Sequence, residues 1–239
     1  MVNRRTKMKL GIVVLMAAIL ILAAAFAGIF YFQSKTHFSP SPSRAVEYKD
    51  GYPNIDWTYW TAQNPDIIGW ITIPHTHVDA PIVQAKANNP QFYLSHDAWG
   101  NWNPWGAIYV SAECVDEGLD SQNTVIYGHN MGNGDTQQFG DLSRYTDYTF
   151  ANEHATILIQ TPAWNKTMQV EFVEIARGWD PVRQTTFSDE LDFSSWYAER
   201  ARAASVTLAD TTEPPSQVFS LVTCSYNYWS SERTIVYAC

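Results

Sequence analysis

Cysteine is scarce in this chain of 239 residues, which contains only Cys114, Cys224 and Cys239. Because three is an odd number, at least one thiol stays unpaired within a monomer. Cys114 and Cys239 each lie just past a predicted strand and could pair, since a disulfide is permitted outside the cell. Nothing in the sequence requires that pair, so it is left open. If Cys224 is a nucleophile, it must remain free.

Positive charge is also scarce. The chain has 15 Lys and Arg against 24 Asp and Glu, for a net charge of −9. Arg4, Arg5, Lys7 and Lys9 lie in the first nine residues, which contain no acid, so the remainder carries a net charge of −13. Phosphate binding needs clustered basic side chains, and we therefore exclude nucleic acid as a partner. A hydrophobic content of 46% predicts a folded core rather than disorder.

Charge of either sign is missing from Leu10 to Phe32, a run of 23 residues. A helix of this length spans about 34 Å, which is enough to cross a bilayer. The basic residues before it predict a cytoplasmic N-terminus and an exported body, by the positive-inside rule. A cleaved signal peptide, with its small-residue site at Ala25-Phe26-Ala27, is the alternative and exports the body equally.

The apolar run sets the expected domain organisation. A stretch rich in Ser and Pro, His37 to Ser43, follows it and is typical of a linker. We find no internal repeat and expect a single-pass membrane protein with one extracellular domain. The expected segments are a cytoplasmic basic tail at residues 1–9, a transmembrane signal anchor at 10–32, a linker at 33–53 and the extracellular domain at 54–239.

Potential metal ligands do not follow metal-binding patterns. His75 and His77 have no third ligand nearby in sequence, and the acidic loop from Cys114 to Asn123 lacks the spacing of a twelve-residue calcium loop. We predict a solvated turn and a solvated loop at these places, and no metal or cofactor.

Many short runs of β-branched and aromatic residues, separated by turn signals, predict a mainly β fold. Their number favours a closed or half-closed barrel. The expected strands are residues 67–73, 82–84, 107–110, 124–127, 155–161, 167–176, 219–224 and 233–238.

Helical periodicity is limited to a few segments. An N-terminal helix is predicted at residues 54–62 with Asn54 as its cap. A second helix is inserted before the strand that ends at Cys224, with Asp192 as its cap and Phe193 and Trp196 on its apolar face. A short helix is also expected at 139–145, and turns at 148–153 and at Asn165-Lys166.

Three side chains capable of chemistry lie at the ends of predicted strands. The hairpin formed by 219–224 and 233–238 places Cys224 and Arg233 over one rim of the sheet, and a thiol beside a positive charge ionises more easily. His129 follows another strand and precedes a glycine-containing turn, and its free pKa of about 6.5 suits acid–base work. Taken singly, a buried structural Cys, a surface Arg and a solvated His would explain each residue equally.

Taken together, three segments resemble the active-site segments of sortases, and the Gly-His-Asn-Met form resembles class B in particular. They are Thr124–Met131, Leu221–Cys224 and Arg233–Ala238. Further similar segments are Asn64–Ile71, Tyr93–Asp97, Gly106–Tyr109 and the inserted helix, so that the resemblance covers roughly residues 54–238.

The resemblance implies a sortase-type closed β-barrel of about eight strands and a transpeptidase without cofactor or metal. It makes Cys224 the nucleophile, His129 the general acid–base and Arg233 the cation of the transition state. Such enzymes cleave an exported protein at a C-terminal sorting signal, Asn-Pro-x-Thr-Asn-like in class B. They form a thioacyl-enzyme and pass the acyl group to an amine of a cell-wall precursor or a pilin.

Substrate contacts are expected at four further positions. Thr223 and Ser225 flank the thiol, and Leu94 is expected to line the peptide groove. Asn89 is the candidate for the family's substrate-facing Asn, although one extra residue separates it from Leu94 relative to the family pattern. Ser220 stands where the family often has Thr, which keeps the hydroxyl.

Two other functions are compatible with the same residues. A secreted cysteine peptidase would pass the acyl group to water. A membrane-tethered binding module would use the ten Trp to contact glycans or proteins.

Overall fold

The computed structural model describes residues 16, 18–25, 48–114, 116–132, 134–178, 183–209, 213–226 and 231–239. The chain divides into two units, Met1–Arg44 and Ala45–Cys239, which are taken separately. In the first unit, residues 16 and 18–25 are helical and exposed. No helix among the described residues is long and apolar enough to cross a membrane. The predicted tail at 1–9 and most of the predicted anchor at 10–32 lie outside the described residues.

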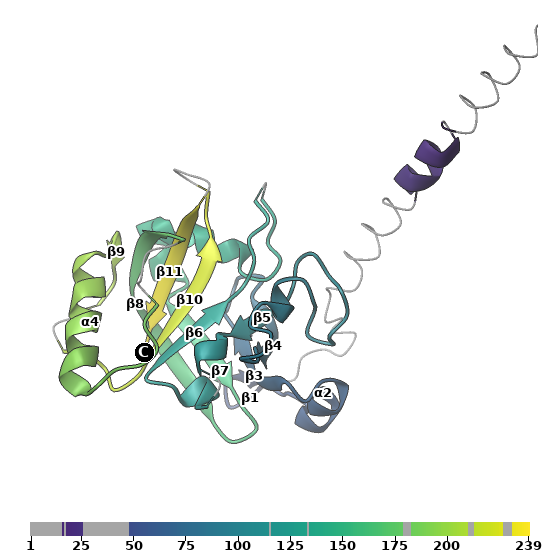
Figure 1. Cartoon of the computed structure of the whole chain (residues 1–239). Coiled ribbons are helices and arrows are strands. Elements are labelled where there is room, and N and C mark those ends of the chain that lie inside the picture. Colours follow the sequence, from purple (N-terminus) through teal and green to yellow (C-terminus); the bar gives the residue numbers. More distant parts are fainter. Residues whose placement is uncertain are drawn as a thin grey trace, which may run out of the picture. The chain divides into compact units, whose positions relative to one another are not determined.

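The second unit is built around a closed β-barrel (Figure 1). The strands follow the order β11-β10-β6-β5-β4-β3-β7-β8-β9, and pairing of β11 with β8 closes the barrel. The prediction of a closed barrel of about eight strands is therefore confirmed. The strand bounds are β3 Ile67–Thr72, β4 Asp79–Gln84, β5 Ile108–Val110, β6 Asn123–Tyr127, β7 Thr156–Gln160, β8 Asn165–Arg177, β9 Val206–Thr207, β10 Val218–Cys224 and β11 Glu232–Ala238.

A small hairpin precedes the barrel and packs on it. Its strands are β1 Tyr48–Lys49 and β2 Tyr52–Pro53, which lie in the segment expected to be linker. Gln160 Nε2 donates to the Pro53 carbonyl at 3.0 Å. The end of the expected linker is therefore fixed to β7.

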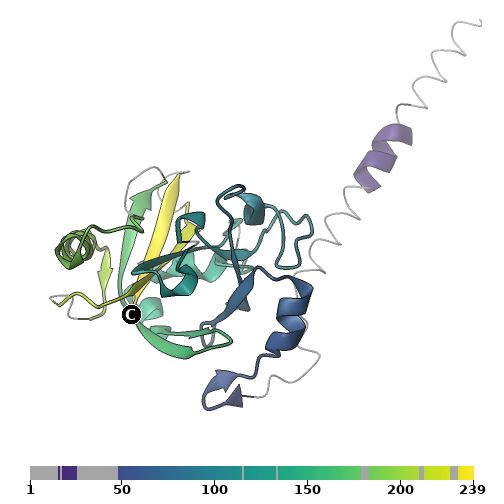
Figure 2. The ribbon, with the colours of Figure 1, turned by 60° about the horizontal axis from the view of Figure 1, so that its bottom comes forward.

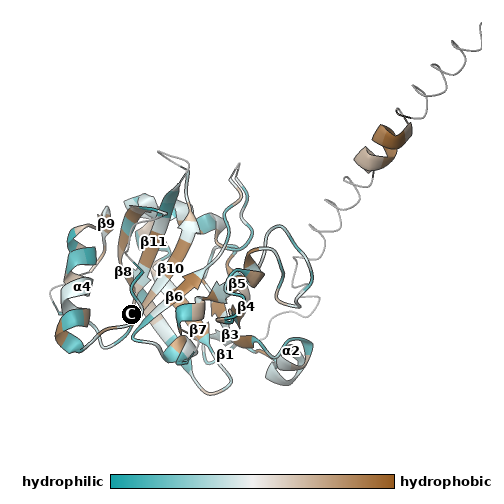
Figure 3. Cartoon of the chain, in the orientation of Figure 1, coloured by the Kyte–Doolittle hydropathy of each residue, from teal (hydrophilic) through white to brown (hydrophobic). Residues whose placement is uncertain are grey.

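Helices are short and connect the strands of the barrel. The α-helices are α2 Trp57–Gln63, α3 Tyr148–Glu153 and α4 Glu190–Arg202, and the 3-10 helices are η1 Phe92–Leu94, η2 Ala112–Cys114, η3 Gly118–Asp120 and η4 Gly140–Thr146. Figures 1 and 2 both place α4 against the wall that contains β8 and β11. In Figure 3 the strands are richer in apolar residues than α4, which keeps a polar face toward solvent.

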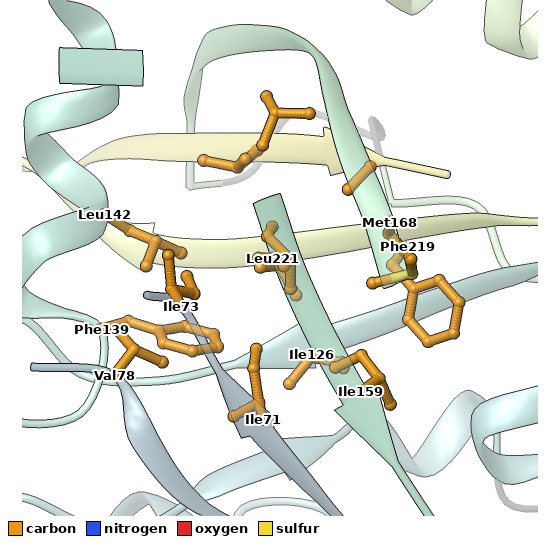
Figure 4. Close-up of a cluster of buried hydrophobic side chains, with 14 of the residues drawn as sticks. Ile71, Ile73, Val78, Ile126, Phe139, Leu142, Ile159, Met168, Phe219 and Leu221 are labelled. Carbon is orange, nitrogen blue, oxygen red and sulfur yellow. The ribbon is translucent and has the colours of Figure 1, made fainter. Parts of the chain in front are cut away.

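The inside of the barrel is filled with aliphatic and aromatic side chains (Figure 4). Ile71 of β3, Ile126 of β6 and Leu221 of β10 meet there, and each is fully buried. Phe139 and Leu142 are also buried in this cluster. Because side chains alternate across a strand, burial of Phe219 and Leu221 inside directs Val222 and Cys224 to the outer face.

A second apolar cluster covers part of this outer face. It joins Phe193, Trp196 and Tyr197 of α4 to Phe172 of β8 and Tyr237 of β11. The rings of Phe172 and Tyr237 stack with centroids 4.5 Å apart. The inserted helix and its predicted apolar face are thus present, and they shield the wall from solvent.

Buried polar groups fasten α4 to the wall. Arg200 Nη1 donates to Glu174 Oε1 at 3.0 Å, and the Tyr237 hydroxyl donates to Glu174 Oε2 at 3.0 Å. Burial, followed by the Glu174 carboxylate, raises the pKa of Tyr237 well above its ordinary value, so its hydroxyl stays a donor. The ion pair thus links α4 to β8, and Tyr237 links β11 to the same carboxylate.

Both predicted helix caps are wrong by a few residues. Asp56 caps α2 by accepting from Tyr59 N at 3.0 Å, in place of Asn54. Asp189 caps α4 by accepting from Asp192 N at 2.9 Å, so the expected cap Asp192 lies in the first turn. In both regions several residues of N-cap type lie close together, and the position of the first helical turn decides which one serves.

Other local predictions also need correction. Residues 148–153 form α3 rather than a turn, because Asp147 accepts from Phe150 N at 2.9 Å and caps a helix. Asn165 and Lys166 open β8, and the turn lies just before them, where Thr161 N donates to the Trp164 carbonyl at 2.8 Å. Strand β4 begins at Asp79, earlier than predicted, and contains Pro81. Pro81 is paired with Trp70 of β3, but it lies before the first residue of β4 that pairs with β5. Because pairing with β5 starts only at Ile82, a proline is tolerated at this position.

The ion pair at α4 yields a stability prediction. Arg200→Ala removes a buried cation that faces the Glu174 carboxylate, and we expect a loss of about 3 kcal/mol in the free energy of unfolding. Urea unfolding of the full chain measures it. Arg202→Ala is the matched control, because Arg202 is exposed and its side chain donates to the Ala198 carbonyl within α4. It should change stability by less than about 0.5 kcal/mol; equal losses in the two variants would refute a stabilising role for the buried pair.

Candidate active site

The register of the barrel places Cys224 opposite Arg233. The two residues are direct cross-strand partners in the antiparallel pair of β10 and β11. Side chains opposite one another in such a pair lie on the same face, with Cβ atoms about 5 Å apart. Both residues are half-buried. The guanidinium and the thiol are therefore held side by side at one end of the wall.

His129 joins them from the other side of β10. Strand β6 runs parallel to β10, with Tyr127 paired to Val222. The pairing continues beyond the strand end, because Gly128 N donates to the Val222 carbonyl at 3.2 Å and Thr223 Oγ1 donates to the Gly128 carbonyl at 2.9 Å. Extending this register by two residues brings His129 beside Cys224.

Asn130 ties the histidine segment to the cysteine. Its Nδ2 donates to the Cys224 carbonyl at 2.8 Å, and its Oδ1 accepts from Gly132 N at 2.9 Å. Asn130 is part of the Gly-His-Asn-Met segment, but no role for its side chain was predicted. That role depends on a contact across 94 positions of the chain, which no local pattern signals.

A backbone carbonyl fixes the orientation of the imidazole. His129 Nε2 lies 2.8 Å from the Leu94 carbonyl oxygen. A carbonyl only accepts hydrogen bonds, so Nε2 must carry the hydrogen. Nδ1 is then the nitrogen left free to accept or donate a proton.

Two glycines allow the close packing that supports this arrangement. Gly106 has φ +59°, and a Cβ there would lie 2.3 Å from the Tyr93 carbonyl oxygen and 2.9 Å from that of Leu94. A Cβ on Gly128 would lie 2.6 Å from the Phe139 ring, while Phe139 N donates to the His129 carbonyl at 3.0 Å. The segments around Tyr93, Gly106 and Gly128, similar to family segments in the sequence, therefore converge on the imidazole.

The guanidinium of Arg233 carries a charge that no carboxylate neutralises within the described residues. Its Nη1 donates to the Glu232 carbonyl at 2.9 Å. Its Nη2 lies close to Gly178, where a Cβ would be only 3.3 Å away. The planar group therefore has room beside β8 and remains available for a further anionic or carbonyl partner.

Aromatic residues that the sequence analysis missed also surround the thiol. Partial burial, then the neighbouring Cys224, raises the pKa of Tyr226, and Arg233 opposes this rise. Burial and the nearby Tyr127 raise the pKa of Tyr109, which Arg183 lowers. Tyr226 has φ +58° and its ring is exposed. A left-handed backbone sets the direction of that ring, and the sequence carries no signal for it.

The four predicted substrate-binding residues occupy different environments. Leu94 is half-buried and reaches His129 through its carbonyl. Thr223 is buried, with its hydroxyl bonded to Gly128, and Ser225 is buried. Asn89 is exposed in a turn where its N donates to the Lys86 carbonyl. No contact described here joins Asn89 to the three residues above, and the substrate contacts of all four stay predictions.

The three cysteines differ in their surroundings. All are free, so the pair of Cys114 and Cys239 that the sequence left open is not formed. Burial raises the pKa of the Cys114 thiol, and burial together with Glu171 raises that of Cys239 to about 12. Both thiols are therefore protonated near neutral pH and poor nucleophiles. No cluster of His, Cys, Asp or Glu in the described residues is arranged to hold a metal ion.

Comparison with known proteins agrees with this architecture. The family model described as sortase domain matches residues 71–239. A Listeria monocytogenes protein named sortase B is 31% identical over 162 residues, which cover 67% of this chain and 63% of that protein. The chain therefore spans slightly less than two thirds of that relative. It belongs to the sortase family, and its relatives are of class B.

Two solved structures show the same fold. A mutant form of Clostridium perfringens sortase B is similar with a TM-score of 0.68 and 26% identity, over 76% of this chain and 84% of that one. A Staphylococcus aureus sortase B–substrate complex is similar with a TM-score of 0.65 and 24% identity, over 76% of this chain and 82% of that one. The expected sortase-type barrel is confirmed.

The support of His129 yields a prediction with a matched control. Gly106→Ala forces the Leu94 carbonyl to move, so we expect the neutral His129 ring to lose its fixed tautomer. Gly100→Ala is the control: Gly100 also has positive φ, but its Cβ would meet nothing within 4 Å. Both variants carry the backbone cost of about 1–2 kcal/mol, and only the first perturbs the imidazole.

The measurement is ¹⁵N NMR of the histidine side chains across a pH titration. In the unsubstituted protein the neutral His129 ring must carry its hydrogen on Nε2. This first measurement tests the assignment even if the Gly106→Ala variant does not fold. A neutral His129 protonated on Nδ1, or equal perturbation by the two glycine variants, would contradict the assignment.

Proposed function

We propose that this protein is a membrane-anchored cysteine transpeptidase. It cleaves an exported protein at a C-terminal sorting signal, forms a thioacyl-enzyme and transfers the acyl group to an amine. The observation that carries the proposal is the convergence of Cys224, His129 and Arg233 at one end of β6, β10 and β11, in a chain of the sortase family.

The first step is attack of the Cys224 sulfur on the carbonyl carbon of the scissile peptide bond. Its thiolate forms the C–S bond, and the carbonyl oxygen becomes an oxyanion. Collapse breaks the C–N bond, and His129 Nδ1 donates its proton to the leaving amine. Nδ1 suits this role because Nε2 is occupied by the Leu94 carbonyl.

Arg233 supplies the charge that this step requires. It lies opposite Cys224 in the strand register and has no carboxylate partner within the described residues. A guanidinium in this place can donate to the oxyanion or to the substrate backbone, where preorganised donors contribute most to the rate. Backbone N–H groups near Cys224 add further donors in this proposal. Thr223 and Ser225, which flank the thiol in the chain, are its expected substrate contacts.

The second step returns the acyl group to an amine. A neutral amine attacks the thioester carbonyl, the C–N bond forms, the C–S bond breaks and sulfur leaves as thiolate. His129, now neutral, takes the proton from the attacking nitrogen. The acceptor belongs to a cell-wall precursor or a pilin, and the signal is Asn-Pro-x-Thr-Asn-like, as the resemblance to class B implies. One similar structure was solved as a sortase B–substrate complex.

The proposed attachment to the membrane rests on the N-terminal sequence. The uncharged run of residues 10–32 and its basic flank support a single-pass anchor with a cytoplasmic N-terminus. The catalytic domain is then extracellular, where exported substrates and cell-wall precursors are found.

The nucleophile and its cation are tested by cleavage of a pentapeptide library by the full chain. We expect Cys224→Ala to abolish cleavage and Arg233→Lys to reduce it about 100-fold, because a point charge does not replace a planar donor pair. Cys239→Ala is the thiol control and should keep activity. Mass spectrometry of products with and without added amine separates transpeptidation from hydrolysis by a peptidase. Cleavage by Cys224→Ala would overturn the assignment, and no cleavage of any peptide would favour an inert binding module.

A further inference from the structure

A cavity of about 470 Å³ lies beside the candidate active site. It opens between the segment that follows His129 and the segment that follows Cys224. Asn130, Asp135 and Asp141 line it from the first, and Ser225 and Tyr226 from the second. A volume of this size suits a ligand of a few amino-acid units. Neither Leu94 nor Asn89 is among its lining residues.

Several contacts connect the cavity to the nucleophile. Asn130 donates to the Cys224 carbonyl at 2.8 Å, and Ser225 follows Cys224 directly in the chain. The Tyr226 ring lies against Gly132, with Cδ2 3.8 Å from the position of a Cβ there. Asn130 and Ser225 therefore line the cavity and adjoin the backbone of Cys224.

The walls of the cavity carry one uncompensated negative charge. Asp135 accepts hydrogen bonds from Trp105 Nε1 at 2.5 Å and Gln137 N at 3.2 Å, which are neutral donors. No cation lies within ion-pair distance of Asp135 in the described part of the chain. Asp141, in contrast, accepts from His77 Nδ1 at 2.8 Å and lies 3.7 Å from Arg144. His77 itself is exposed, as predicted for a solvated turn.

A buried hydroxyl on the same wall lacks a partner. Ser225 is 3% exposed, and its Oγ has no hydrogen-bond partner among the described residues. A buried polar group of this kind normally finds a partner, and one supplied by a ligand satisfies it. The hydroxyl can accept a hydrogen bond from an amine nitrogen, as a carboxylate does.

We propose that this cavity binds the acceptor amine, with Asp135 holding its ammonium group and Ser225 guiding the nitrogen toward the thioester on Cys224. This inference rests on the proposed function and adds the place and the charge of the second substrate. The bound ammonium first loses one proton to solvent. The neutral nitrogen then attacks the thioester, the C–N bond forms as the C–S bond breaks, and His129 receives the second proton.

The experiment measures transfer of an acyl group from a cleaved sorting peptide by the full chain. Triglycine and an Nα-blocked lysine amide are the charged probes, and hydroxylamine is a probe that is mostly uncharged near neutral pH. We expect Asp135→Asn to raise KM for a charged amine about tenfold, while hydroxylamine and the rate of cleavage without amine are unaffected. Asp135→Glu should restore most of the affinity.

Asp116→Asn removes the same charge from an exposed position that does not line this cavity, and it should leave KM unchanged. Thermal unfolding of each variant shows that the fold is retained. An unchanged KM in Asp135→Asn, equal effects on hydroxylamine, or use of hydroxylamine alone by the unsubstituted protein would overturn the inference. Absence of peptide cleavage in every variant would instead overturn the proposed function.

Discussion

The hydrogen-bonded register of β10 is the constraint on which the active site depends. β10 pairs in parallel with β6 and in antiparallel with β11, so one strand fixes the position of the sulfur relative to both partners. A slip of one residue would turn Cys224 into the barrel and expose Phe219 and Leu221, which are 1% and 0% exposed. The packing energy of the core therefore holds the nucleophile on the outer face, far more firmly than any contact of the thiol itself.

The imidazole is positioned in a different way. His129 lies two residues beyond the end of β6, where loop contacts add to the last ladder bond, from Gly128 N to the Val222 carbonyl. The Leu94 carbonyl fixes the ring, while Asn130 fixes the backbone to Cys224. Gly106 and Gly128 let neighbouring segments approach closely enough for these bonds. Cys224 and Arg233 thus lie on paired strands, whereas the His129 imidazole lies on a loop that hydrogen bonds hold in place.

The sequence predicted what depends on local pattern and missed what depends on distant contacts. Strand ends at Tyr127 and Cys224 followed from alternation and turn signals, and the barrel agrees with them. The caps were wrong because Asn54 and Asp56, like Asp189 and Asp192, are equally suited by residue type. Asp141 meets His77 across 64 positions. The direction of the Tyr226 ring follows from a left-handed backbone that a tyrosine rarely adopts.

The helix inserted before β10 explains why the site lies at the end of the wall rather than at its middle. The outer face of β10 and β11 is apolar along Val222, Ile235 and Tyr237, and α4 buries it. β11 anchors that helix indirectly through Tyr237 and Glu174, and the same strand carries Arg233 beyond the cluster that α4 joins. Because α4 excludes water from one part of the face, only the part bearing Cys224 and Arg233 is left for a substrate. One part of β11 therefore stabilises the fold by packing under α4, and another part, at Arg233, stays accessible to a substrate.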